Sequence, residues 1–503
     1  MRGSITVFAT LVMMLVGQFL FTLAEAGRFL ELDKVAAMDS ESNIESVFAQ
    51  YCKPLWDEYN LLLYDCGKES ELDINGLEKY LQMQCDNNFA INTDGKSNNT
   101  SLLRLNTESV NITQYTLMTD AQGEVFARSV SSYMERNFAY EAAKKIYSNY
   151  QSVKSITENS GYEDAGEVDR VDTGNLNKQN GFMLCTSSTD VTNNNDFSDF
   201  TGEITVNDMV VENPLVSIKE AKAGGVLNLV LSEDKVSGNK IDLSDSVSER
   251  KLNTGKNPVL FESDWYDSVL VEQYLLSYMS CYTEPIENHA MKYELEYLIG
   301  GDATDKDNLT AVVDRLLMIR GGIDFAYLCT DSKRQAEALV LATAIATAML
   351  NPELAEVIKW AILAGWAFVE SVLDVRALLS GDKVPLMKSN DTWTSGLLEI
   401  PTLLCSDKKA KSSDIGLNYK AYLGILLLFN GTQTQAYRAM DMQEATIRMT
   451  QGYEMFRMDN GICQLSVDFN YKYHGLFISF ISLINIGSNE FHIGKNQKYS
   501  YYK

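Results

Sequence analysis

Glu370 and Asp374 are the two side chains in this sequence whose spacing best suits acid–base chemistry. A separation of four residues places both carboxylates on one face of a helix, and Arg376 follows two residues later. Two carboxylates placed in this way can serve as the general acid and general base of a hydrolase. Such groups more often neutralise a Lys or Arg on a neighbouring helix, and we favour that structural role for this pair.

A second set of charged side chains lies at separations of three or four residues near the C-terminal end. Its members are Arg438, Asp441, Glu444 and Arg448. Residues three or four apart are neighbours on a helix surface. The pattern therefore predicts an ion-pair ladder along one helix rather than a catalytic site.

Two acidic stretches suggest calcium loops, but neither has the required spacing. A calcium loop carries oxygen ligands at alternate positions, Gly at the sixth position and Glu at the twelfth. Counting from Asp305, those two positions hold Thr310 and Leu316, and the stretch that begins at Asp73 fails in the same way. We expect Asp305 or Asp307 to cap the helix that follows.

The cysteines and histidines do not form a recognisable catalytic or metal-binding motif. The three histidines are His289, His474 and His492, and none of the 8 cysteines belongs to a CxxC pair. Disulfide pairing stays open, although we favour free, buried cysteines because a chain of this length can fold without disulfides. GxSxG, HExxH, P-loop and dinucleotide-binding signatures are also absent from the sequence. We therefore predict no catalytic, cofactor-binding or metal-ligating residues, no cofactor and no enzymatic activity.

The charge of the chain limits its partners. The formal net charge is −25. A nucleic-acid-binding protein needs a surface rich in Lys and Arg, so nucleic acid is not an expected partner. An acidic surface of this kind favours solubility.

The elements that position these residues predict an α+β fold that is mainly α. We expect an N-terminal transmembrane or stalk helix, a small part with strands and a large helical domain. The expected segments are 1–28 (membrane anchor), 29–153 (stalk helices, short strands and a helix), 154–258 (polar, loop-rich insertion), 259–484 (helical domain ending in a strand) and 485–503 (frayed tail). In residues 29–66 we expect the first helix to continue from the membrane until it is interrupted near Lys53 and Pro54. We expect Pro54 to begin a second helix, because Pro suits the first turn.

The remaining elements follow from hydrophobic periodicity. Expected helices cover 69–84, 122–153, 266–282, 290–299, 308–320, 334–349, 352–379, 418–429 and 433–448. Expected strands cover 102–118, 225–231 and 464–473, and the last of these could pair with the first.

Two strongly apolar helices, 336–350 and 354–372, lie on either side of Asn351 and Pro352. The first is too short to span a bilayer, and the second contains Glu356, Lys359 and Glu370. We therefore predict a buried helical hairpin rather than membrane spans. Asn351 is the expected N-cap, with Pro352 at the start of the second helix.

The longest apolar run, residues 5–24, is long enough to cross a bilayer. Arg2 and the amino terminus precede it, so the positive-inside rule places the N-terminus in the cytoplasm and the rest of the chain outside. Ala24-Glu25-Ala26 also fits a signal-peptide cleavage site. We favour a retained single-pass anchor in the cell membrane because the run is long for a signal and the helical pattern continues beyond residue 26.

The N-terminus also resembles the type IV pilin-like head of minor pseudopilins from tight-adherence (Tad-type) systems. The resemblance rests on residues 3–9, 25–28 and 35–37. Those proteins usually carry a Glu just inside the apolar helix, where this chain has Thr6-Val7-Phe8. Retention of the helix, cleavage after Ala26 and processing after Gly3 all stay open, as does entry into a filament.

Most of the chain also resembles an uncharacterised family of Gram-positive bacterial membrane-anchored proteins. The matching stretches are 46–51, 55–59, 293–301, 307–309, 366–370, 374–376, 383–388 and 438–441 with Glu444. Members of that family tend to be encoded near Tad-type pilus or secretion components, and the resemblance implies no catalytic residues.

The resulting functional hypothesis is a membrane-anchored, extracytoplasmic structural or accessory protein. It would be a pseudopilin-like component of a Tad-type pilus or secretion system, with protein partners in that assembly. The first alternative is a surface-exposed adhesin or ligand-binding module that uses the insertion at 154–258. The second alternative is an exported hydrolase that uses Glu370 and Asp374.

Overall fold

The computed structural model describes residues 2–69, 71–89, 105–136, 138–159, 200–202, 204–206, 209–258, 264–476 and 490–502. The chain divides into two compact units, and each is treated by itself. Unit 1 comprises Met1–Ser132, Arg250–Glu262 and Ile447–Lys503, and unit 2 comprises Tyr133–Glu249 and Ser263–Thr446. Both units draw on separated stretches of sequence, whereas the segments expected from composition are contiguous. Those segment boundaries stay a prediction.

Unit 1 combines one long helix with an antiparallel sheet. Its helices are α1 (Arg2–Phe48), α2 (Lys53–Tyr59), α3 (Ile74–Phe89), η1 (Ala121–Gly123), most of α4 (Glu124–Met134) and η6 (Met458–Asn460). Its strands are β1 (Tyr64–Asp65), β2 (Gly67–Lys68), β3 (Glu71–Leu72), β4 (Leu105–Leu117), β7 (Gly461–His474) and β8 (Glu490–Ser500). β7 pairs with β1, β4 and β8, all antiparallel, and β2 pairs with β3.

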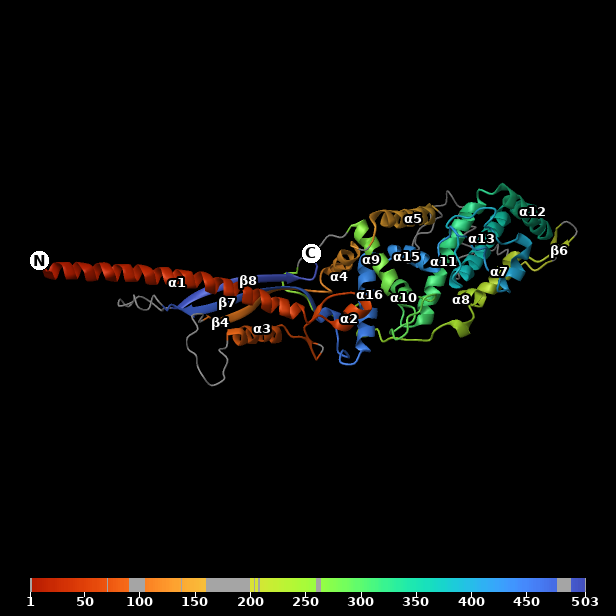
Figure 1. Ribbon diagram of the computed structural model, residues 1–503. Helices are drawn as coiled ribbons and strands as arrows, with labels where there is room; N and C mark the ends of the chain where they lie inside the picture. Colours follow the sequence, from red (N-terminus) through yellow and green to blue (C-terminus); the bar gives the residue numbers. More distant parts are fainter. Residues whose placement is uncertain are drawn as a thin grey trace. The chain divides into compact units, whose positions relative to one another are not determined.

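The pairing of β4 with β7 confirms the predicted association of the 102–118 and 464–473 regions. Ile112 lies opposite Val467, and Leu105 lies opposite Tyr473. Alternate residues of β7, including Val467 and Phe469, join a core with apolar residues of α1 and α3. Figure 1 shows the second half of α1 and α3 beside the strands.

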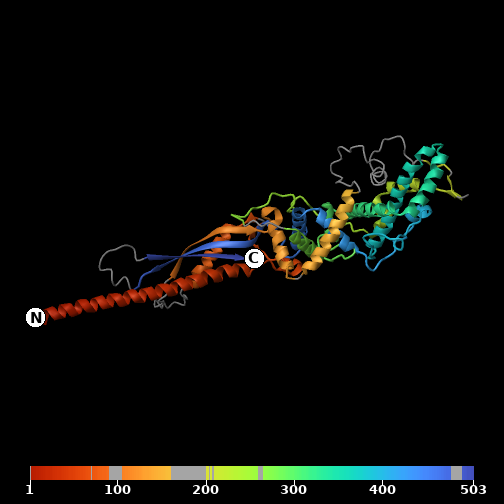
Figure 2. The same ribbon diagram turned by 90° about the horizontal axis from the view of Figure 1, so that it is seen from above.

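The two halves of α1 differ in their surroundings within unit 1. In both views of the chain, the first half of α1 extends beyond the sheet and the second half lies along it (Figures 1 and 2). Leu32, Ala36, Ile44 and Val47 recur on one helix face and are buried in the core. Burying Leu32, Ile44 and Val47 contributes about 1.5–3 kcal/mol for each side chain, so the second half of α1 is an integral part of unit 1.

Unit 2 is mainly helical. Its helices are α5 (Tyr140–Asn159), α7 (Pro214–Ala223), α8 (Val226–Val230), η3 (Glu233–Lys235), α9 (Trp265–Tyr278), α10 (Glu294–Gly300), α11 (Asp305–Leu328), α12 (Ser332–Ala348), η4 (Pro352–Leu354), α13 (Ala355–Leu379), η5 (Leu397–Glu399), α14 (Ile400–Leu404), α15 (Tyr419–Phe429) and most of α16 (Thr432–Arg448). The described strands β5 (Ile204–Val206) and β6 (Met209–Val211) form a hairpin. The α+β, mainly α class is confirmed.

The predicted hairpin is confirmed as α12 and α13, which pack against each other and, in the case of α13, also against α11. The predicted burial holds for α13 but not for α12, where 5 of 17 residues are buried and Val340 is 53% exposed. Nearly every residue of α13 from Ile358 onwards is buried. Pro352 does begin the second helical segment, but as a 3₁₀ turn, and the Asn351 side chain makes no capping hydrogen bond. Pro352 suits this place because a first-turn residue needs no N–H donor.

Three predicted elements are wrong. The helix expected over 122–153 is two helices, α4 and α5. The strand expected over 225–231 is the helix α8, because a short apolar run fits either structure by pattern alone. The tail expected to fray forms β8, whose ladder with β7 holds a largely polar edge strand in place. The part of the expected insertion at 160–199 lies outside the described residues.

Candidate functional site

Glu25 and Arg28 join α1 to the end of β7 within unit 1. Arg28 Nη1 donates to Glu25 Oε1 at 2.8 Å and to the carbonyl of His474 at 3.0 Å. Glu25 Oε2 accepts from the backbone N–H of Leu476 at 3.1 Å, and the Arg28 guanidinium lies over the Tyr473 ring. Both charged side chains are almost fully buried. The fold of unit 1 therefore uses residues on both sides of the cleavage site suggested by Ala24-Glu25-Ala26.

The apolar half of α1 ends directly before this junction. Its large side chains are exposed, among them Phe8, Met13, Leu15 and Phe19 at 65–75%. Among the described residues, α1 is the one helix that is long and apolar enough to cross a membrane. Length and composition fit a membrane anchor and a signal sequence alike.

The predicted pair Glu370 and Asp374 forms a buried ion-pair cluster in unit 2. Lys388 Nζ donates to Glu370 Oε1 at 2.7 Å and to Asp374 Oδ1 at 2.6 Å. Arg320 on α11 donates to Asp374 Oδ2 at 2.7 Å and to Asp324 Oδ1 at 3.0 Å. All five side chains are fully buried. The structural role that we favoured for the pair is the one observed, because Lys388 and Arg320 already neutralise these carboxylates.

Three carboxylates share two cations in this cluster. Burial raises the pKa of Asp324 well above its usual range, although Arg320 opposes that effect. Burial lowers the pKa of Lys388, but Asp374, Asp324 and Glu370 more than offset it, so the Lys388 pKa is raised. The raised pKa favours a proton on Asp324, and one proton there would make the cluster neutral. Asp324 Oδ2 has no hydrogen-bond partner among the described residues.

Other predicted ion pairs are replaced by bonds to backbone carbonyls. Arg376 does not join the cluster; it donates to the carbonyls of Leu403 and Leu404 at the end of α14. Arg438 likewise donates to two carbonyls of α10 instead of to Asp441. The last carbonyls of a helix have no partner within that helix, so a nearby guanidinium satisfies them. The predicted ladder is therefore wrong for Arg438 and Asp441.

The helix cap is Thr304 rather than Asp305 or Asp307. The Thr304 hydroxyl accepts from the Asp307 N–H at the start of α11. Asp305 is fully buried and accepts from the N–H groups of Lys292 and Tyr293 instead. In the part of the chain that the structure describes, no three His, Cys, Asp or Glu side chains are grouped to hold a metal ion.

Seven of the cysteines lie in described residues. Five are buried as expected, whereas Cys329 is half-buried and Cys405 is exposed. Burial raises the pKa of Cys52, Cys66 and Cys85 to about 12, so these thiols are protonated and unreactive at neutral pH.

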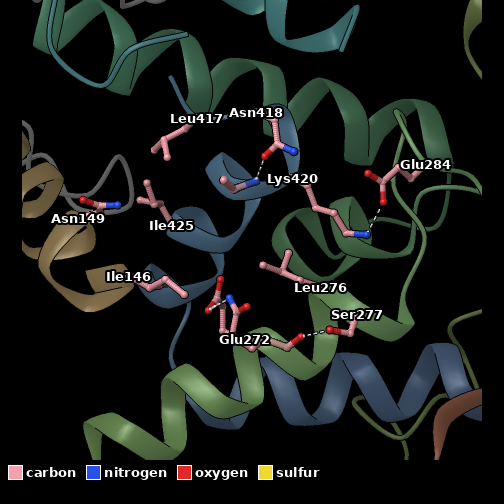
Figure 3. A pocket seen from close by; sticks show the side chains of 12 residues that line it. Ile146, Asn149, Glu272, Leu276, Ser277, Glu284, Leu417, Asn418, Lys420 and Ile425 are labelled. Carbon is pink, nitrogen blue, oxygen red and sulfur yellow. Dashed lines mark hydrogen bonds and ion pairs between the residues drawn. The ribbon is translucent and has the colours of Figure 1, made fainter. Parts of the chain in front are cut away.

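A cavity of about 640 Å³ opens in unit 2 among α5, α9 and α15 (Figure 3). Aliphatic side chains of all three helices line it: Ile146, Leu276, Ala421 and Ile425. Small-molecule sites typically occupy about 300–1,000 Å³ and combine apolar walls with a few polar groups. The size of this cavity falls within that range, and its lining combines five aliphatic residues with seven polar or charged ones.

Glu272 is the buried acid of the cavity. Its side chain is 1% exposed, and Gln273 Nε2 donates to Glu272 Oε2 at 2.8 Å. Figure 3 shows the carboxyl group pointing from α9 toward the space between Ile146 and Leu276. A side chain at Gly424 would bring Cβ within 2.1 Å of Glu272 Oε1, so this glycine makes room for the acid. Burial raises the pKa of Glu272 to about 7, and the bond from Gln273 lowers it only in part.

A second charged pair lies at the same cavity. Lys420 Nζ donates to Glu284 Oε2 at 2.6 Å, so this cation is already neutralised. Lys420 and Glu284 are partly exposed, whereas Glu272 is not. Our sequence analysis did not select Glu272. The available signal was a single acid inside the apolar run of α9, with Val269, Leu270 and Val271 before it.

Residues 205–473 match the model of a family of unknown function, DUF5702. The chain belongs to this family. No curated protein and no solved structure matches it. In this DUF5702 protein, the matched region contains the cluster around Glu370 and Asp374, together with α9 and α15 of the cavity. It does not include α5 or the apolar half of α1, so those parts lie outside the family's defining region.

Proposed function

We propose that this protein is a membrane-anchored extracytoplasmic component, with α1 retained as a single membrane span. Its role would be structural or accessory, as a pseudopilin-like part of a Tad-type pilus or secretion system. The observation that carries the anchor is the buried junction of Glu25 and Arg28 with the end of β7. Cleavage after Ala26 would remove Glu25 and leave the Arg28 charge without its carboxylate partner in a buried place, which is costly.

The exposed half of α1 supports the same proposal. An apolar helix of this length is stable in a bilayer, or against other apolar helices in that bilayer, but not in water. The second half of α1 is held in the unit 1 core, so an assembly force on the membrane half would be transmitted to the folded domain. The pilin-like head is the basis of the Tad-type assignment, which is an inference by association.

Fractionation of the native membrane, with the mass of the mature N-terminus, tests the anchor. A membrane-bound chain beginning at Met1 supports a retained anchor, and a start at Ser4 supports prepilin-type processing. A soluble chain beginning at Gly27 would overturn the proposal. Protease accessibility in intact cells tests the topology, because an extracytoplasmic domain is cleaved and a cytoplasmic one is protected.

Variants at the junction test whether unit 1 needs the residue before the cleavage site. Glu25→Ala should destabilise unit 1 by about 3–5 kcal/mol, because the buried Arg28 loses its charged partner. Glu31→Ala is the matched control, since Glu31 is exposed on the same helix. Equal stability of the two variants would remove the structural argument for retention.

A photo-crosslinker tests the Tad-type role. Leu15 is 68% exposed in the apolar half of α1. We expect a crosslinker at this position to capture another Tad-type component in native membranes, identified by mass spectrometry. Capture of lipid alone would support an anchor without an assembly role.

The alternatives have different support. The adhesin hypothesis depends on the insertion, of which 160–199 lies outside the described residues, so it stays a prediction. Deleting 160–199 tests it without removing α7 or α8, which pack against α13.

The hydrolase hypothesis depends on Glu370 and Asp374, which are fully buried and paired with Lys388. We therefore do not favour it.

A further inference from the structure

We propose that the unit 2 cavity binds a small organic cation, with a primary ammonium group at the Glu272 carboxylate and an aliphatic body against Leu276 and Ile425. This site is independent of the membrane role proposed above. The inference begins from the position of a single buried carboxylate beside the aliphatic side chains that form part of the cavity wall; the rest of the lining is polar.

The hydrogen bonding of Glu272 leaves capacity for a ligand. Gln273 donates to Oε2, and no described residue donates to Oε1. An ionised carboxylate accepts several hydrogen bonds, and a buried one without enough donors is unfavourable. An ammonium group supplies both the positive charge and the missing donors, because it carries three N–H bonds.

The charge at the cavity selects a cation over an anion. Lys420 is held by Glu284, so an anionic ligand would have to displace that carboxylate and then approach Glu272. A metal ion is also disfavoured, because no group of three ligating side chains occurs among the described residues. A cationic ligand meets the opposite charge without disturbing the Lys420–Glu284 pair.

The walls define the rest of the ligand. Ile146, Leu276 and Ile425 offer aliphatic surface, which an alkyl chain would cover, and burial of each methylene is favourable by about 0.8 kcal/mol. A fully hydrated metal-like cation would gain nothing from these walls. The site therefore favours an alkylammonium compound over ammonium itself.

Isothermal titration of the full chain in detergent micelles with n-pentylamine tests the proposal. We expect saturable binding of n-pentylamine, and binding of 1-pentanol that is weaker by about tenfold or more because it lacks the charge. Nα-acetyllysine N-methylamide presents the same ammonium group as a polypeptide side chain. Binding of either amine that is tighter than binding of 1-pentanol supports the site. The amine that binds more tightly identifies the source of the ammonium group, a free alkylamine or a lysine side chain of a polypeptide. Equal binding of pentanol, or no saturable binding of either amine, would overturn the proposal.

Variants locate the ligand in this cavity. Glu272→Gln keeps the shape of the side chain and should weaken n-pentylamine binding about tenfold or more. Ser277→Ala is the matched control, because Ser277 lines the cavity but its hydroxyl donates to the Gln273 carbonyl; its affinity should stay within about twofold. Ala421→Leu narrows the cavity without touching Glu272 and should also weaken binding. Unchanged affinity in both Glu272→Gln and Ala421→Leu would place the amine elsewhere and overturn the inference.

Discussion

The buried acids of unit 2 fall into two kinds that differ in their partners. Glu370 and Asp374 share Lys388, and Arg320 adds a second cation to Asp374. Glu272 and Glu296 have only neutral donors, and burial raises the pKa of each to about 7. Glu370 and Asp374 stand out in the sequence because they are four residues apart on one helix, and both turn out to be neutralised by a cation from another segment. An acid that can respond to a ligand or a proton is identified by the absence of such a cation.

Removing the cation of the paired acids should have the largest effect. Lys388→Met removes the ammonium group that Glu370 and Asp374 share and leaves both carboxylates buried. We therefore expect a loss of about 3–5 kcal/mol in the free energy of unfolding. Urea denaturation followed by tryptophan fluorescence measures it. Lys408→Met is the control, because Lys408 is half exposed beside Glu399 and should cost less than about 1 kcal/mol. Similar losses in both variants would show that the buried cation Lys388 contributes no more to stability than the half-exposed Lys408.

The unpaired acid Glu272 should make stability depend on pH. Its pKa is about 7 in the folded chain against an ordinary value of 4.5, so the folded state binds more protons between these values. Stability from this group is therefore present below about pH 4.5 and is lost as the pH rises through 7, by about 3 kcal/mol in total. Glu272→Gln should remove this contribution. A wild-type pH profile unchanged by the substitution would contradict the raised pKa.

Glu296 allows a test of how much a neutral hydrogen-bond donor stabilises a buried acid, and the expected effect is smaller than for Glu272. The Tyr419 hydroxyl donates to Glu296 Oε1 at 2.8 Å in a fully buried place. Tyr419→Phe should cost about 2 kcal/mol at pH 8, where Glu296 is ionised, and less at pH 5. Tyr140→Phe is the control, since Tyr140 is 52% exposed. A cost independent of pH would indicate a packing effect rather than a bond to an ionised acid.

Asp324 should show the smallest effect. Its raised pKa favours the neutral form beside Arg320, and in that form Asp324→Asn replaces one neutral group by another. We expect a change below about 1 kcal/mol, measured by the same urea denaturation. A loss as large as that of Lys388→Met would mean that Asp324 is ionised and belongs with the paired acids.

Local sequence predicted the elements better than the contacts between them. The paired role of Glu370 and Asp374 was predictable from their spacing, but Arg320 lies on another helix and Lys388 in the following loop. Nothing local specifies such partners, because they meet only when α11 and α13 pack. The missed strand β8 has the same cause, since a polar edge strand is held by its ladder with β7 rather than by its own propensity.

The sequence by itself determined the apolar half of α1, the pairing of α12 with a buried α13 and the mainly α class. These follow from hydrophobic periodicity and length, which are properties of contiguous residues. Only the tertiary structure decided that Glu25 and Arg28 fasten α1 to β7, and that Glu272 lies in a cavity whose lysine, Lys420, pairs with Glu284 instead. The junction and the surroundings of Glu272 both depend on side chains from distant segments that exclude water around a charge. Those side chains come together only when the chain packs.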